Sequence, residues 1–149
     1  MSASRLFAID EQIQLNAMYL LALLYESGSN SPLQDLILSF FLIKHSSLLN
    51  KLWSIRSTKK AERVTGNSAF YYPSPVGETF KSAVHYLMRF GLVSAHLVDG
   101  SLVYTARHSS ITITIPQTVS NRAKIVTHLL GSMGRDELKH LIQEGVSIE

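Results

Sequence analysis

The sequence predicts an α+β fold that is mainly helical and carries a three-stranded antiparallel sheet. Apolar residues recur at helical spacing in the first and the last third of the chain. Between these thirds, Asp99-Gly100 separates two runs rich in apolar and β-branched residues, which is the strongest short-range signal for a hairpin. The alternating run 109–115 predicts a third strand, and Pro116 ends it.

Residues 1–56 are predicted to form the N-terminal helices. The first covers 10–26 and ends before Gly28, a residue suited to a left-handed cap. The second follows Ser31, with Pro32 at its first turn, and a short third helix ends near residue 56. The first two helices are apolar nearly all round, a pattern typical of helices that are covered on more than one side.

The rest of the chain divides into three parts. Segment 57–75 is predicted to be a basic and aromatic linker, because it is long for a connection inside a domain. Residues 76–115 follow as a helix plus the strands, and 117–149 as C-terminal helices, all within a single domain 1–149. Helix, glycine, strand, Asp-Gly turn and strand follow one another in 76–106. This order is that of the second half of a winged helix, so we expect a winged-helix-like domain with a β wing.

The apolar composition predicts a core that is large for the length of the chain, together with apolar surface that a partner covers. Hydrophobic residues make up 46% and charged residues 17%, whereas about 25% charged is usual. There is no cysteine, which excludes disulfides and thiolate metal sites. The longest apolar run, AMYLLALLY, is shorter than the ~20 residues a membrane span needs. The first residues also lack the pattern of a signal peptide. We therefore expect a cytoplasmic protein with no membrane segment.

The sequence lacks the motifs of common catalytic and cofactor sites. It contains no glycine-rich phosphate loop, no HExxH metal motif and no GxSxG nucleophile elbow. Its six histidines are scattered, with no pair spaced for a shared metal ion. We therefore predict no catalytic residues, no cofactor and no metal, and a protein that is not an enzyme.

Two groups of residues remain as candidates for binding. The net charge is only +3, and most of the positive excess lies between Lys44 and Arg63. On the predicted helix 76–90, three basic residues share one face at intervals of four, although an ordinary solvated face explains this pattern equally. The candidates for nucleic acid are Lys59, Lys60, Arg63, Lys81, His85 and Arg89. The candidates for a partner interface are aromatic, as at many binding hot spots, although packing in the core is the alternative: Phe40, Phe41, Trp53, Phe70, Tyr71 and Tyr72.

The order of these elements resembles the middle component of ABC-three-component defence systems, which include the Lamassu-type systems. The resemblance rests on the N-terminal helix IDEQIQLNAMYLLALLYES, the second helix LQDLILSFFLIKHSSLL and the block FKSAVHYLMRFGLV…DGSLVYT. It ends with a C-terminal helix that carries Arg122-Ala123-Lys124. Where related proteins often have an Arg- and Pro-containing turn, this chain reads HSSLLNKLW, which leaves the subfamily open.

The resemblance implies a non-catalytic adapter subunit. Such a subunit bridges an SMC-like ATPase and an effector protein, often a nuclease, in an anti-phage or anti-plasmid defence complex, and DNA is reached through the complex. The alternative function is a winged-helix DNA-binding transcriptional regulator, in which Lys81, His85 and Arg89 enter the major groove. No Lys or Arg lies between Leu92 and Thr105, and this argues against a wing that meets phosphate.

Overall fold

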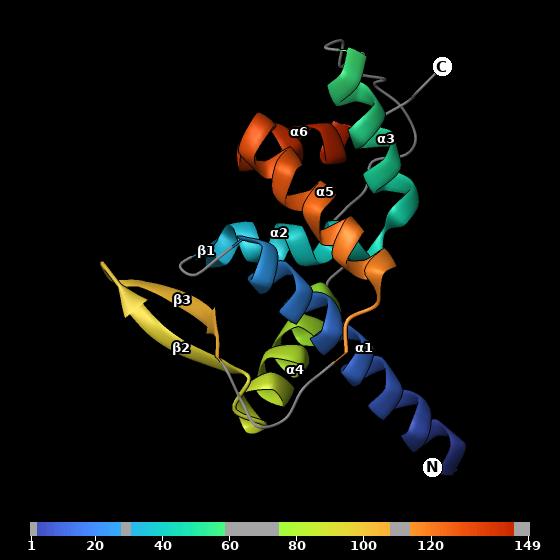
Figure 1. The fold of residues 1–149 in the computed structure, drawn as a ribbon, viewed down its shortest axis with the longest axis vertical. Coiled ribbons are helices and arrows are strands. Elements are labelled where there is room, and N and C mark those ends of the chain that lie inside the picture. The colour runs from blue at the N-terminus through green and yellow to red at the C-terminus, as the bar shows by residue number, and fades with distance from the viewer. Residues whose placement is uncertain (1–2, 28–30, 59–74, 108–113, 145–149) are drawn as a thin grey trace.

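Figure 1 shows the fold in a computed structural model of the chain. The structure describes residues 3–27, 31–58, 75–107 and 114–144. In these residues it is mainly helical with a small antiparallel sheet, so the predicted α+β class is confirmed. The elements are α1 (Ala3–Ser27), β1 (Ser31–Pro32), α2 (Leu33–Lys44), α3 (Ser46–Thr58), α4 (Pro75–Arg89), β2 (Val93–Val98), β3 (Ser101–Ala106), α5 (Gln117–Met133) and α6 (Arg135–Glu144).

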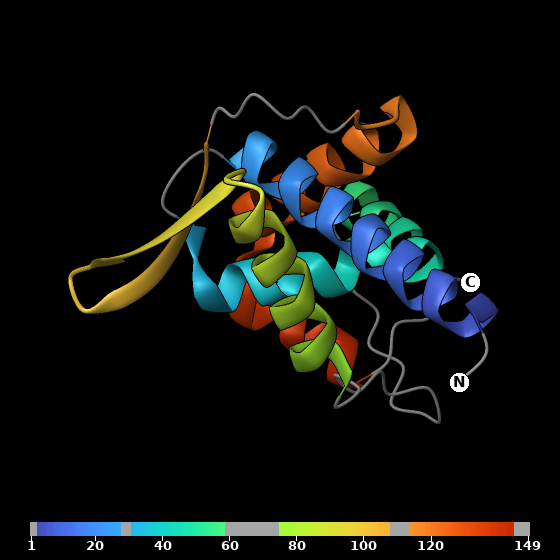
Figure 2. The ribbon, with the colours of Figure 1, turned by 90° about the horizontal axis from the view of Figure 1, so that it is seen from below.

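The C-terminal half of α1 lies at the centre of the fold, and Figure 2 shows α4 and α5 beside the helix. Residues 20–24 of α1 are all buried, because α2, α4, α5 and β3 together surround this half of the helix. The chain's own elements therefore explain why α1 is apolar nearly all round. The sequence predicts cover on more than one side, and for residues 20–24 the chain itself supplies that cover.

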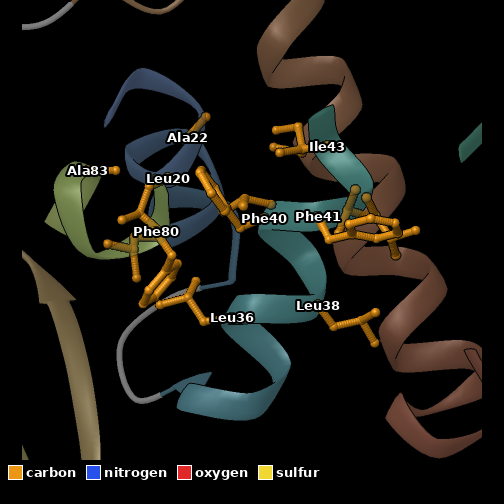
Figure 3. Close-up of a cluster of buried hydrophobic side chains, with 14 of the residues drawn as sticks. Leu20, Ala22, Leu36, Leu38, Phe40, Phe41, Ile43, Phe80 and Ala83 are labelled. Carbon is orange, nitrogen blue, oxygen red and sulfur yellow. The ribbon is translucent and has the colours of Figure 1, made fainter. Parts of the chain in front are cut away.

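The helix α2 is apolar for the same reason, and residues 40–43 are all buried. Figure 3 shows Phe40 on the side of α1 and α4, and Phe41 on the opposite side, toward α5. The Phe40 ring meets the ring of Phe80 on α4 edge to face, with centroids 5.6 Å apart. Because these adjacent rings point to different neighbours, α2 has almost no polar face.

The hairpin of β2 and β3 has the predicted two-residue turn. Val98 pairs with Ser101, and the turn residues Asp99 and Gly100 have φ angles of 51° and 80°. Positive φ at both positions is what this hairpin requires, and Asp-Gly tolerates it well.

The third strand of the sheet is not the one that the sequence predicts. Residues 109–113 of the predicted strand lie outside the described residues, and Thr114 and Ile115 belong to no strand. The two-residue β1 instead pairs antiparallel with β3, Ser31 opposite Tyr104, which gives the strand order β1-β3-β2. A two-residue strand is too short for alternation to reveal, and its proline cannot donate to a sheet.

The C-terminal helices join the same core. One cluster of buried side chains draws on all six described helices. The guanidinium of Arg122 on α5 donates to the carbonyl of Ile43 at the end of α2 and lies 5.3 Å from the ring of Tyr19. On α6, Arg135 forms a 3.2 Å ion pair with Asp35 of α2. None of the described helices has the length and the apolar character to span a bilayer.

Candidate functional site

The end of α4 is set by a hydrogen-bonded cap. Gly91 follows the helix with a φ of 71°. The N–H of Leu92 donates to the carbonyl of Leu87 at 2.9 Å, and the N–H of Gly91 donates to that of Met88 at 3.1 Å. This pair of bonds is a Schellman motif, and the two leucines that accompany it are buried. The cap holds the last turn of α4, where Arg89 lies, in a defined position.

One charged stripe of α4 faces solvent. Lys81, His85 and Arg89 are all exposed and follow one another by a turn, so the structure brings these predicted residues together. Glu78, also exposed, lies one turn before Lys81 and carries the opposite charge. The opposite face of the helix packs inside the protein through Phe80, Ala83, Val84 and Leu87.

An open groove of about 510 Å³ lies between α1 and α4, next to this stripe. Its α4 wall carries both polar and aromatic groups, and the rings of Tyr86 and Phe90 pack 4.8 Å apart. The lining residues are Ile13, Gln14, Ser82, His85, Tyr86, Arg89 and Phe90. The sequence gives no local signal for the groove, because Ile13 and Gln14 come from α1, about 70 positions away along the chain.

The tip of the hairpin is exposed and carries two apolar side chains beside the carboxylate of Asp99. Leu97 has 72% of its surface exposed and Val98 has 39%. The root of the hairpin is anchored, because Val103 is buried and Tyr104 lies 6.1 Å from the ring of Phe80. Burial also raises the pKa of the Tyr104 hydroxyl above its ordinary value.

The structure separates the predicted partner residues into three groups. Phe40 and Phe41 are 0% and 1% exposed, so both are core residues and neither presents a surface to a partner. Trp53 is half-buried and packs edge to face on His128, with ring centroids 5.4 Å apart, so it joins α3 to α5. The other partner candidates, Phe70, Tyr71 and Tyr72, lie outside the described part of the chain. The nucleic-acid candidates Lys59, Lys60 and Arg63 also lie outside it.

A second, smaller cavity lies between α1, α2 and α5. It has a volume of about 110 Å³ and a mostly apolar lining, which includes Leu23, Leu36 and Leu130. Asp35 is its one acidic group, and the carboxylate is already paired with Arg135. In the described residues, no three His, Asp or Glu side chains gather as metal ligands would. Within the part of the chain that the structure describes, the groove and the hairpin tip are the surfaces on which the proposals below are built.

No protein-family model matches this chain, and comparisons with the curated proteins and with the solved structures find no match either.

Proposed function

We propose that this protein is a non-catalytic adapter subunit with a winged-helix-like fold. Its partners are an SMC-like ATPase and an effector protein, a nuclease, in an anti-phage or anti-plasmid defence complex. These partners are the ones implied by the resemblance to the middle components of ABC-three-component systems. The surfaces that bind them are the hairpin tip and the exposed side of α4.

The connectivity supports the winged-helix-like part of the proposal. A short strand, β1, stands between the first two helices, and α4 leads directly into the hairpin. The sheet order β1-β3-β2 places this short strand beside the second strand of the hairpin. In a winged helix the strands follow the same order, and the helix before the hairpin is the one that docks on a partner molecule.

The apolar hairpin tip is the observation that carries the adapter function. A wing that binds a phosphate backbone presents Lys or Arg, and here no such residue lies between Leu92 and Thr105. The tip presents Leu97 and Val98 instead. Asp99 at the turn is also exposed and carries a negative charge, which repels phosphate. Apolar side chains such as Leu97 and Val98 are typical of the centre of a protein–protein interface.

The experiment is co-expression with the products of the neighbouring genes, followed by affinity capture. We expect the wild-type chain to retain a coiled-coil ATPase. The amount of ATPase captured with Leu97→Asp should be at least about tenfold lower, because a carboxylate at the centre of an interface is costly to desolvate. Tyr25→Asp, on the exposed end of α1, is the matched control and is expected to bind normally. A wild-type protein that stays monomeric beside these partners would refute the proposal.

The alternative, a DNA-binding regulator, is favoured by the exposed stripe on α4. If Lys81 and Arg89 each neutralise one phosphate, affinity for duplex DNA should fall about tenfold between about 50 and 200 mM salt. A fall of less than about threefold would remove the electrostatic force on which this alternative depends.

A further inference from the structure

We infer that the groove between α1 and α4 is a docking site for an acidic amphipathic segment of a partner protein. The inference rests on the proposed function and deepens it, because it states the chemistry that the partner brings to α4. It follows from three properties of the groove: its apolar walls, its charge and the spacing of its basic groups.

The walls of the groove provide apolar contact. Ile13 from α1 and Tyr86 and Phe90 from α4 line it, and Phe90 keeps 37% of its surface exposed. A volume of about 510 Å³ lies within the range of about 300–1,000 Å³ typical of ligand pockets. An apolar side chain that enters the groove would exchange contact with water for contact with these walls.

The charge of the groove selects acidic partners. His85 and Arg89 line it, while Gln14 and Ser82 add neutral hydrogen-bonding groups, and none of the lining residues that the structure describes is a carboxylate. The acid of the same helix, Glu78, lies 11 positions before Arg89 and hence about 16 Å along the axis. A partner carboxylate at the Arg89 end therefore meets a cation that none of the described lining residues neutralises.

The spacing of the basic groups suits a helix. His85 and Arg89 lie one helical turn apart, a rise of about 6 Å. Carboxylates three or four residues apart on a partner helix have the same spacing. An amphipathic helix in a groove is a common mode of peptide recognition, and its apolar side chains would meet Ile13 and Phe90.

Duplex DNA fits the groove less well. Phosphates gain nothing from the apolar side chains of Ile13 and Phe90, and Tyr86 offers them a single hydroxyl. Binding to a phosphate backbone also depends on the number of cations, and the groove supplies one permanent cation, Arg89. A protein segment with both acidic and apolar side chains uses the whole lining.

The test uses the full chain as bait for a displayed library of random peptides. We expect enriched peptides to carry two or more acids beside an apolar residue. The strongest is synthesised with a fluorescent label, and its Kd is measured by anisotropy at about 0.15 M salt. Ser82→Trp fills the groove from an exposed position and should weaken binding at least about tenfold. Arg89→Glu should weaken binding similarly.

Two matched variants control for bulk and charge. Ser132→Trp and Lys124→Glu alter exposed positions on α5, outside the groove, and should bind like the wild type. Circular dichroism confirms that each variant is folded. The inference is overturned if no peptide is enriched, if the enriched peptides lack acids, or if Ser82→Trp binds as the wild type does. The inference is also overturned if labelled duplex DNA binds the wild type and Ser82→Trp abolishes that binding.

The same variants separate this inference from the proposed function. In one outcome, Ser82→Trp still forms the ATPase complex and no acidic peptide binds the wild type. This outcome refutes the groove inference and leaves the adapter function standing. In the other outcome, acidic peptides bind in the groove and no ATPase is captured. This outcome refutes the adapter function and leaves the docking site standing.

Discussion

Replacing Phe40 by alanine tests whether this ring stabilises the core or serves a partner. The side chain is fully buried between α1, α2 and α4, so we expect the change to leave a cavity. Truncation of a buried Phe to Ala lowers the free energy of unfolding by about 3–5 kcal/mol. The edge-to-face contact with Phe80 accounts for about 0.5–1.5 kcal/mol of this cost. The ammonium of Lys44, 5.1 Å from the ring centroid, adds about 0.5–1 kcal/mol.

The expected loss is large against the total stability of such a domain, about 5–15 kcal/mol. For a chain of this length, each kcal/mol lowers Tm by about 2–4 °C, so Tm should fall by roughly 10 °C. Urea denaturation followed by circular dichroism measures the free energy of unfolding directly.

Two further variants control the result. Leu97→Ala truncates a large apolar side chain at an exposed site and should change stability by no more than about 0.5 kcal/mol. In a double-mutant cycle, Phe40→Ala and Phe80→Ala should show a coupling of about 0.5 kcal/mol or more. The core assignment is wrong if the free energy of unfolding of Phe40→Ala lies within about 1 kcal/mol of the wild-type value and the variant loses partner binding. The ring then serves an interface.

Two other predictions use the same denaturation assay. Gly91→Ala should destabilise the protein by about 1–2 kcal/mol, because a φ of 71° is unfavourable for a residue with a Cβ. Gly77→Ala, in open space on α4, should stabilise the protein by about 0.5 kcal/mol. Changes of the same sign in the two variants would contradict the cap at Gly91. Because burial raises the pKa of Tyr104 above 10.0 in the folded state, its contribution to stability is complete below pH 10.0 and is lost as pH rises through the folded pKa. Tyr104→Phe should lack this loss, and parallel stability curves for the two proteins above pH 10.0 would disprove the burial effect.

Local sequence chemistry was sufficient to predict several features of this fold. The Asp99-Gly100 turn, the end of α4 at Gly91 and the helical character of the flanking segments are all found. Each depends on residues within a few positions of one another, whose backbone preferences do not need distant partners. The stripe of Lys81, His85 and Arg89 was predictable for the same reason, because helical periodicity alone places these side chains on one face.

Long-range packing governed the features that the sequence predicted wrongly or not at all. Apolar periodicity indicates that α1 and α2 are covered, but it cannot distinguish a neighbouring helix of the same chain from a partner protein. The structure covers them with α4 and α5, and so Phe40 and Phe41 are core residues. The pairing of β1 with β3 and the groove between Ile13 and Phe90 join residues about 70 positions apart. Burial and strand pairing of this kind depend on which surfaces come into contact in the folded chain. The local sequence does not specify these long-range contacts.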